Sequence, residues 1–223
     1  MKKIVTVAID GPASSGKSTV SRCLARDLNY IHIDTGAMYR GLTLAAIENQ
    51  VPFDDEKELF DLLSKLNVSF EHHEGRQHVY INQRDVTKDI RTREVTNHAS
   101  EVAAHSSIRK ELVNRQRLLA ENNNVIMDGR DIGTVVLPQA DFKFFLDANV
   151  EERAHRRHKE NLERGIESSF EEIKKELEER DFKDKNREVA PLKAAEDAII
   201  IDTTEMDIHQ VILKIKEYLS EES

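Results

Sequence analysis

Cysteine is almost absent from this chain, since Cys23 is the only one among 223 residues. No disulfide can therefore form within the chain, and we expect a reducing compartment, the cytoplasm. Cys23 falls on the apolar side of a predicted helix. This position favours a packed thiol over a catalytic one.

Long apolar runs and an excess of positive charge are missing as well. No run of about 18 or more apolar residues occurs, which predicts that no segment spans a membrane. The short apolar run after Lys3 ends at Asp10, which favours a strand over a signal peptide. The net charge of −9 argues against general binding of nucleic acid or of anionic membranes.

The composition and length are those of a soluble globular protein. Hydrophobic residues make up 39% of the chain and charged residues 34%. The length suits one α/β domain with insertions. We find no internal repeat.

One stretch, residues 11–19, fits the phosphate-binding pattern G-x-x-x-x-G-K-[ST]. The β-branched run Ile4–Ile9 precedes it, and apolar residues at helical spacing follow as far as Asn29. Backbone N–H groups of such a loop cradle phosphate oxygens, while Lys17 reaches the β- and γ-phosphates and Ser18 holds Mg²⁺. The alternative is an ordinary strand-to-helix turn. The predicted ATP-binding residues are Gly11, Pro12, Ala13, Ser14, Ser15, Gly16, Lys17, Ser18 and Thr19.

Five short apolar segments separated by helical patterns predict a doubly wound parallel sheet, with ligands at the carboxyl ends of its strands. After the first, these segments are residues 30–34, 125–128, 142–147 and 198–202. The stretch Val68–Asn82 differs, because it alternates and turns at Glu74 and Gly75. It predicts a β-hairpin with polar faces. His72 and His73 are neighbours on this strand and face opposite ways, so a metal site there is not expected.

Polar residues follow three of the predicted strands. The loop after the second strand, residues 34–40, carries a carboxylate, a hydroxyl and Arg40, which suits bidentate phosphate binding. The alternative is an exposed arginine without a function. Asp128 at the end of another strand is placed to orient the waters of Mg²⁺, or else to cap a helix. Arg130 and Asp131 follow directly.

The highly charged segment Glu151–Glu188 predicts two helices around Arg164 and Gly165. For most of this run the bland interpretation is a solvated pair of helices. The stretch Arg180–Arg187 carries more charge than a capped helix needs, and we interpret it as a movable segment that grips phosphate; the alternative is a plain solvated end. The arginines of the whole segment include Arg153, Arg156, Arg157, Arg180 and Arg187.

Together these stretches make the chain resemble the bacterial cytidylate kinases. The resemblance rests on residues 11–19, 34–40, 86–91, 129–136 and 179–187, which stand in the family's order and span essentially the whole chain. Gly-Arg-Asp-Ile-Gly-Thr-Val-Val at 129–136 is specific among nucleoside monophosphate kinases. Lys183 and Lys185 stand where the family often has arginine, which keeps the charge but loses bidentate geometry.

The resemblance implies a P-loop kinase fold: a five-stranded parallel sheet flanked by helices, a small antiparallel β insert and a helical lid. It divides the chain into three core segments, a monophosphate-binding domain and the lid. The core segments are residues 1–36, 96–150 and 189–223. The monophosphate-binding domain is 37–95, with the insert at about 67–90, and the lid is 151–188.

The implied reaction is ATP-dependent phosphorylation of CMP and dCMP to CDP and dCDP with Mg²⁺, in pyrimidine nucleotide metabolism. The implied partners are ATP and CMP or dCMP, without nucleic acid or membrane, in a monomer. A kinase for another monophosphate or a small metabolite remains an alternative. A nucleotide-dependent switch is another, although the Asn-Lys-x-Asp with which GTP switches read guanine is absent.

The resemblance also implies roles for single residues. The catalytic set would be Lys17, Arg130, Arg180 and Arg187. The CMP-binding set would be Asp34, Thr35, Arg40, Ser100, Arg109, Arg130, Asp131, Arg180, Asp184 and Arg187. Within it, Thr35, Arg40 and Arg130 would hold the monophosphate, and Ser100, Arg109 and Asp131 would read the cytosine. Arg180 and Asp184 would contact the sugar, and Arg187 the phosphates.

Overall fold

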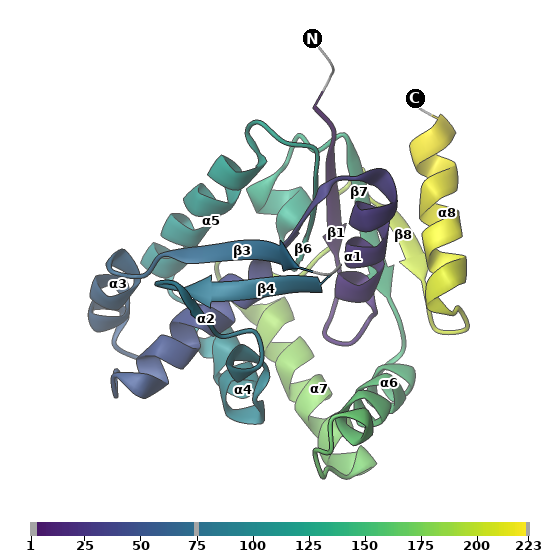
Figure 1. Cartoon of the computed structure of the whole chain (residues 1–223). Helices are drawn as coiled ribbons and strands as arrows, with labels where there is room; N and C mark the ends of the chain where they lie inside the picture. Colours follow the sequence, from purple (N-terminus) through teal and green to yellow (C-terminus); the bar gives the residue numbers. More distant parts are fainter. Residues whose placement is uncertain (1–3, 74–75, 222–223) are drawn as a thin grey trace.

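A five-stranded parallel sheet forms the centre of the protein (Figure 1). The computed structural model describes residues 4–73 and 76–221. The strand order is β2 (Ile31–Asp34), β6 (Val125–Gly129), β1 (Thr6–Asp10), β7 (Phe142–Asp147) and β8 (Ile199–Asp202). All neighbouring strands are parallel, so their carboxyl ends share one edge. The predicted doubly wound sheet and its five strands are confirmed.

The central strand shows why these segments are apolar throughout. Val7 and Ile9 pack into a cluster with α1 (Lys17–Leu28) and α8 (Ile208–Glu221). Ala8 points to the other face, where it packs with Val113 of α5 (Ser106–Ala120). Because both faces are covered by helices, the strand buries every side chain from Val7 onward.

Helix α2 (Thr35–Glu48) begins directly at the end of β2. Asp34 caps it, since its Oδ1 accepts a hydrogen bond from the amide of Ala37 at 3.0 Å. The segment from Thr35 to Arg40, predicted as a loop, is therefore the first part of a helix. A residue type that ends a strand also starts a helix when its carboxylate can reach the N–H groups of the first turn.

The remaining helices before α5 lie between α2 and α5 in the chain. They are α3 (Glu56–Ser64), a 3-10 turn at Asp89–Arg91, and α4 (Arg93–Val102), which a short break separates from α5. This break lies at residues 103–105.

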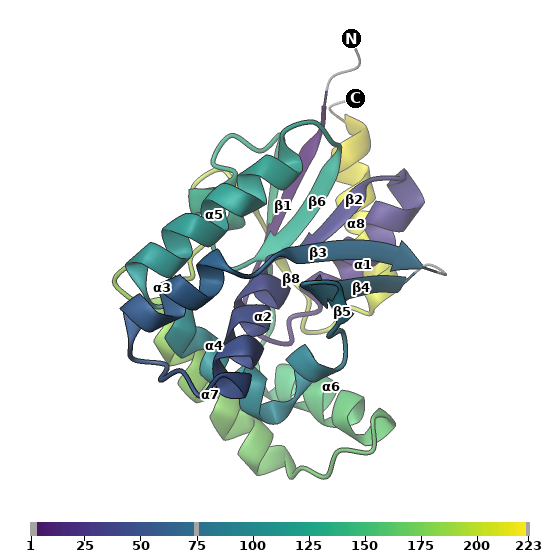
Figure 2. The ribbon, with the colours of Figure 1, turned by 60° about the vertical axis from the view of Figure 1, so that its left-hand side comes forward.

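The predicted hairpin is present as β3 (Val68–His73) and β4 (Arg76–Ile81), extended by β5 (Arg84–Asp85) (Figure 2). The turn predicted at Glu74 and Gly75 lies outside the described residues. The prediction of polar faces was wrong for one face. Val79 is only 3% exposed, and Val68, Phe70 and Ile81 pack against apolar residues of α2. Alternation on a strand indicates one apolar face, and here that face covers the helix.

Helices α6 (Val150–Glu163) and α7 (Phe170–Asn186) lie below the carboxyl edge of the sheet in Figure 1. They confirm the predicted helix pair. They are not merely solvated, because Ala154, Ile173 and Leu177 form an apolar seam that also includes Ala13 of the P-loop. That the pair moves as a lid stays a prediction. Among the helices that the structure describes, none is both long and apolar enough to cross a bilayer.

Candidate active site

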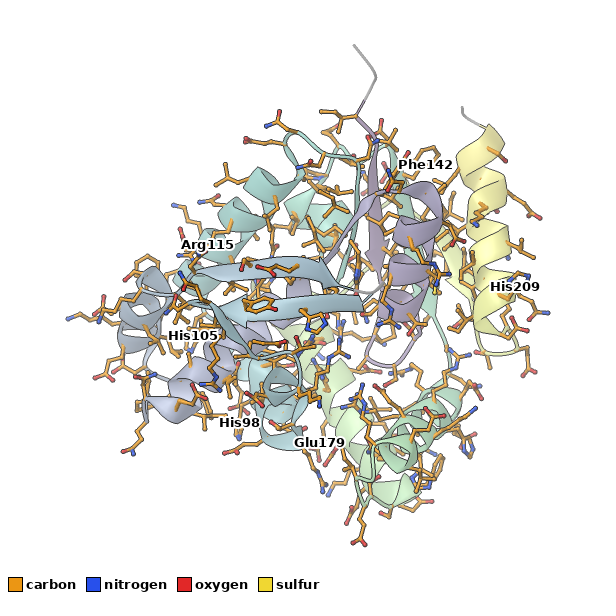
Figure 3. The ribbon with its side chains drawn as sticks, viewed as in Figure 1. His98, His105, Arg115, Phe142, Glu179 and His209 are labelled. Carbon is orange, nitrogen blue, oxygen red and sulfur yellow. The ribbon has the colours of Figure 1, made fainter. Side chains whose placement is uncertain are left out.

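A cavity of about 960 Å³ opens along the carboxyl edge of the sheet. Polar side chains gather around it from the sheet edge, from α4, where His98 is labelled, and from α7, where Glu179 is labelled (Figure 3). Most of the predicted site residues line it. Those that do not are Gly11, Pro12 and Ser15, which form the underside of the P-loop.

The backbone of the P-loop requires its glycines. A Cβ on Gly11 would lie 2.1 Å from the carbonyl oxygen of Leu146, so no larger residue fits. Gly16 has φ +90°, a left-handed conformation that favours glycine. Gly16 also caps α1 without any side-chain hydrogen bond, which leaves the first N–H groups of the helix for a ligand.

Lys17 is held inside the loop before any phosphate arrives. Its Nζ donates to the carbonyl oxygen of Pro12 at 2.8 Å, and the residue is 6% exposed. Burial, followed by the nearby guanidinium of Arg130, lowers the pKa of the Lys17 amine well below its usual value. A phosphate anion would supply the counter-charge that this amine lacks.

Ser18 and Asp128 meet beside the P-loop. The Oγ of Ser18 donates to Oδ2 of Asp128 at 2.5 Å, and Oδ1 of Asp128 lies 2.6 Å from Nε2 of His32. Asp128 caps no helix, which removes the alternative considered for it. A hydroxyl and a carboxylate are oxygen ligands of the kind that Mg²⁺ takes, with phosphates and water completing its shell. The described residues contain no group of three or more His, Cys, Asp or Glu that could hold a metal by themselves.

The start of α2 presents Arg40 toward the cavity. Its NH2 donates to Oδ2 of Asp34 at 2.8 Å, so both oxygens of Asp34 are used within the protein. Burial alone would raise the pKa of Asp34, but the Arg40 guanidinium outweighs it and the pKa lies below its usual value. Asp34 therefore acts on the cavity through Arg40. Thr35 is also engaged, because its Oγ1 donates to the carbonyl oxygen of Asp128 at 2.8 Å.

Arg91 also lines the cavity beside Arg40, and the sequence analysis assigned it no function. Burial, followed by the charge of Arg40, lowers the pKa of Arg91. Arg91 ends the stretch 86–91 that carried part of the resemblance, so the motif contained the signal that this residue belongs to the site.

Asp184 on α7 contacts three other residues that the sequence predicted for the site. It is 3% exposed and accepts hydrogen bonds from Nε of Arg130 at 2.9 Å and from Oγ of Ser100 at 3.3 Å. Arg187 lies 3.9 Å away as a further ion-pair partner. Burial acts to raise the pKa of Asp184, but the three neighbouring cations, led by Arg130, hold it below its usual value.

Asp131 and Arg109 form a second group of contacts, beside the group around Asp184. Both residues are buried, and NH1 of Arg109 donates to Oδ2 of Asp131 at 2.6 Å. The guanidinium of Arg109 also lies over the ring of Tyr39, 5.2 Å from its centroid. Arg187 links the groups around Asp184 and Asp131, since its NH2 also lies 3.8 Å from Oδ1 of Asp131. Arg109 and Asp131 therefore come together as predicted, whereas Ser100 lies with Asp184.

A carboxylate outside the predicted site residues supports the backbone next to Asp131. Asp10, at the end of β1, accepts hydrogen bonds from the amides of Ile132 and Gly133, both at 2.8 Å. These amides follow Asp131 directly, so Asp10 fixes the backbone that carries it. Burial raises the pKa of Asp10 to about 7.

The cavity concentrates positive charge that its carboxylates neutralise only in part. Arg40 is paired with Asp34 and Arg130 with Asp184, but Arg180 has no ion pair of this kind among those described. Burial and the neighbouring arginines, first among them Arg130, lower the pKa of Arg180 to about 10. Lys17, Arg91 and Arg180 all have their pKa lowered in part by other cations of this wall. Arg40 and Arg180 each keep a buried Nε, and Arg187 a buried NH2, without a hydrogen-bond partner among the described residues. Such a wall is suited to a ligand that carries several negative charges.

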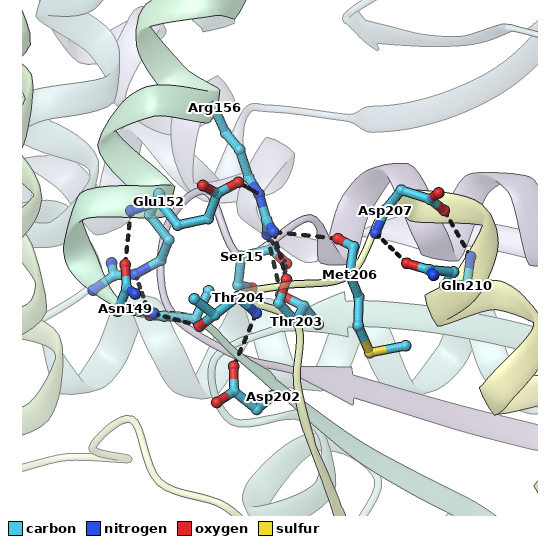
Figure 4. Close-up of polar contacts among 12 residues, drawn as sticks. Ser15, Asn149, Glu152, Arg156, Asp202, Thr203, Thr204, Met206, Asp207 and Gln210 are labelled. Atoms are coloured by element: carbon cyan, nitrogen blue, oxygen red, sulfur yellow. Dashed lines mark hydrogen bonds and ion pairs between the residues drawn. The ribbon is translucent and has the colours of Figure 1, made fainter.

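Two arginines of the predicted lid, Arg153 and Arg156 on α6, bind atoms of the protein itself. Arg156 donates to the carbonyl oxygen and Oγ1 of Thr203 and to the carbonyl oxygens of Met206 and Ser15 (Figure 4). Arg153 donates to the carbonyl oxygen of Ala13 and to Asp181 of α7. Both guanidinium groups bind protein atoms, and thereby attach α6 to the P-loop and to the loop after β8.

Comparison with known proteins shows the family of this chain. The family model described as cytidylate kinase matches residues 7–221. The chain belongs to the cytidylate kinase family. The cytidylate kinase of Leuconostoc mesenteroides is 54% identical over 209 residues, which cover 94% of this chain and 93% of that protein. The cytidylate kinase of a Geobacillus species is 53% identical over 221 residues, with 99% of both chains covered.

Membership of the cytidylate kinase family makes this chain a phosphotransferase that phosphorylates CMP and dCMP, a kinase of pyrimidine nucleotide metabolism. The nucleotide-dependent switch is thereby set aside. The fold has wider relatives. A shikimate kinase from Bacteroides thetaiotaomicron superposes with a TM-score of 0.52 at 13% identity, covering 98% of this chain and 99% of that one. At this identity the likeness concerns the P-loop kinase fold alone.

Proposed function

We propose that the cavity binds ATP with Mg²⁺ on the P-loop side and CMP or dCMP on the side of α2, α5 and α7, and that the γ-phosphoryl group passes between them. The observation that carries this proposal is a wall of cations around one cavity, in which Arg40 and Arg180 each keep a buried Nε without a hydrogen-bond partner among the described residues. The cations of this wall are Lys17, Arg40, Arg91, Arg130 and Arg180. Two phosphate-bearing substrates supply the charge that this wall lacks.

The residues would act mainly by positioning and by electrostatic stabilisation. Phosphoryl transfer spreads negative charge over the transferred group, and fixed cations in a site that excludes water stabilise that charge. Lys17 and Arg130 approach this group from the P-loop and from the end of β6, and Arg180 approaches it from α7. The acceptor oxygen of a nucleotide monophosphate is already anionic near neutral pH, so no general base is required.

Mg²⁺ would be held by Ser18, with Asp128 orienting its waters, and would neutralise charge on the donor phosphates. The oxygen ligands present at this point support the assignment.

The cytosine would be recognised by Arg109, Ser100 and Asp131. Cytosine offers acceptors at O2 and N3, which suit Arg109 and Ser100, and a 4-amino donor, which suits Asp131. The burial of Arg109 and Asp131 supports this role, because buried polar groups discriminate strongly against a base that leaves them unpaired.

The helices α6 and α7 would close over both substrates and exclude water from the reaction. Their attachment to Ala13 and to Asp131 supports such a lid, because it links them to the donor and acceptor sides. A cytoplasmic location and a monomeric state remain predictions, and sedimentation of the purified protein tests the second.

A coupled assay for ADP release tests the proposal across CMP, dCMP, UMP, AMP, GMP and shikimate. We expect CMP and dCMP to give the highest kcat/KM. Lys17→Ala should fold normally and lose kcat by about 100-fold or more, because it removes the cation at the β- and γ-phosphates. A preference for shikimate or a purine monophosphate, or normal turnover by folded Lys17→Ala, would contradict the proposal.

A further inference from the structure

We propose that His32 is a positioning residue that holds Asp128 in the orientation needed beside Ser18, and so strengthens the binding of the metal–nucleotide complex. His32 belongs to none of the motifs that carried the family resemblance. The inference rests on the proposed function, because it assumes that Ser18 and Asp128 lie at the Mg²⁺ position.

The imidazole lies inside the protein and directly against the carboxylate. His32 occupies β2, with Ile126 as its register partner on β6, two residues before Asp128. His32 is 3% exposed and Asp128 is 1% exposed. Nε2 of His32 lies 2.6 Å from Oδ1 of Asp128. Because an ionised carboxylate only accepts hydrogen bonds, Nε2 carries the hydrogen and donates it.

The other ring nitrogen of His32 supports a role toward Asp128. Nδ1 of His32 is buried and has no hydrogen-bond partner among the described residues. A buried polar atom without a partner destabilises the folded protein, because it has lost its hydrogen bonds to water. An apolar residue such as Ile33, the next residue of β2, would fill a core position without that cost. The bond to Asp128 is the contact that compensates for it.

The backbone of His32 is fixed from the insert. Nε2 of Gln77 on β4 donates to the carbonyl oxygen of His32 at 2.6 Å. The imidazole therefore stands on a strand that is paired on one side with β6 and covered by the hairpin at this point. A donor held in this way can fix the rotation of the carboxylate it binds.

This arrangement matters when a nucleotide binds with its metal. The hydroxyl of Ser18 donates to Oδ2 of Asp128 in this structure, and a metal held by Ser18 would take that hydroxyl from Asp128. His32 would then be the donor that still holds Oδ1 and keeps Oδ2 directed to the metal side. Without His32, Asp128 would be free to turn toward the buried amine of Lys17, whose positive charge attracts it.

Calorimetric titration of ADP with and without Mg²⁺ tests the inference without using catalysis. The quantity of interest is the metal gain, defined as the ratio of the ADP dissociation constants without and with Mg²⁺. We expect His32→Leu to lower this gain by about 10-fold, as for other residues that orient metal ligands, and to leave metal-free ADP binding within about twofold. His32→Gln should keep most of the gain, because its amide can donate to the same oxygen.

Three controls separate positioning from packing. His209→Leu removes an exposed imidazole on α8 (Figure 3) and should change nothing. His32→Asn keeps a polar group near Nδ1 but cannot reach Asp128, so it should behave like His32→Leu and replaces that variant if leucine prevents folding. In an Asp128→Asn background, His32→Leu should cause no further loss, since the two residues act as one unit.

The outcomes distinguish the inference from the function on which it rests. If the wild-type protein shows no metal gain, the proposed Mg²⁺ position is wrong. If the wild type shows the gain and folded His32→Leu and His32→Asn keep it, His32 only fills space and the inference is wrong.

Discussion

The two helices below the sheet have similar charged sequences but opposite relations to the cavity. On α6, Arg153 and Arg156 direct their guanidinium groups to protein atoms of the P-loop and of the loop after β8. On α7 and just beyond it, Arg180 and Arg187 each keep a buried nitrogen without a hydrogen-bond partner among the described residues. The first helix is therefore attached to the P-loop, whereas the second leaves guanidinium nitrogens at the cavity without a hydrogen-bond partner among the described residues.

The difference shows that charge density alone does not identify a ligand-binding arginine. The useful criterion is whether the protein itself satisfies the guanidinium group. The fully bonded arginine should matter for stability, and the unmatched arginine should matter for catalysis. The following predictions test this contrast, from the largest expected effect to the smallest.

Arg180→Ala should lower kcat by about 100- to 1,000-fold, because it removes a cation that stabilises charge in the transition state. Arg180→Lys should recover part of the rate, since it restores the charge without the planar fork. Lys175→Ala, at a side chain of α7 that is 78% exposed, is the matched control and should keep normal kcat. Steady-state kinetics with CMP provide the measurement. A near-normal kcat for Arg180→Ala would remove α7 from the catalytic machinery.

Arg153→Ala should destabilise the protein by about 3 kcal/mol, because it leaves the carboxylate of Asp181 buried without its partner. Lys174→Ala breaks the pair with Glu151, whose side chain is 66% exposed, and should cost at most about 1 kcal/mol. Urea denaturation followed by circular dichroism measures both. Equal costs for the two variants would show that the buried contact does not anchor α6.

Asp131→Ala should lower kcat/KM for CMP more than for UMP, and narrow their ratio by at least about tenfold, or 1.4 kcal/mol. Uracil carries a hydrogen at N3 and an acceptor at O4, so Asp131 favours cytosine only. Asp184→Ala should lower both values without changing the ratio, because Asp184 is predicted to contact the sugar. If Asp131→Ala reduces both substrates by the same factor, Asp131 holds Arg109 and Arg187 in place and does not read the base.

Asp10 and Asp184 should affect stability with different pH dependences. The pKa of Asp10 is raised to about 7, so its native state keeps a proton that the unfolded chain has lost. Its contribution to stability is therefore complete at acidic pH and is lost as the pH rises toward 7. Asp184 has a lowered pKa, so its contribution is present above its unfolded pKa and is lost only in stronger acid.

Urea denaturation at pH 5, 6, 7 and 8 tests this contrast with the variants Asp10→Asn and Asp184→Asn. The cost of Asp10→Asn should be larger at pH 5 than at pH 8, whereas that of Asp184→Asn should stay constant over this range. A constant cost for Asp10→Asn would mean that Asp10 is ionised throughout, stabilised by the amides of Ile132 and Gly133.

Local chemistry in the sequence determined the strands, most helices and the P-loop. A buried parallel strand needs a continuous apolar run. Gly11 stands where a Cβ would clash with the backbone of Leu146, and Gly16 adopts a left-handed φ that favours glycine. Apart from the contact with Leu146, these requirements act within a few neighbouring residues, so they can be recognised without knowing the fold. The same holds for the strand-end positions of Asp10, Asp34 and Asp128, which place polar groups at one edge of the sheet.

Only the tertiary structure decided which partners these residues bind. Ser18 and Asp128 meet across 110 residues of sequence, His32 and Asp128 across 96, and Arg153 and Ala13 across 140. No periodicity or motif encodes such pairs, because they depend on how strands are ordered and how α6 and α7 lie against the sheet. For this reason the sequence predicted that arginines would surround the phosphates, whereas the structure separated those that face the cavity from those that hold the protein together.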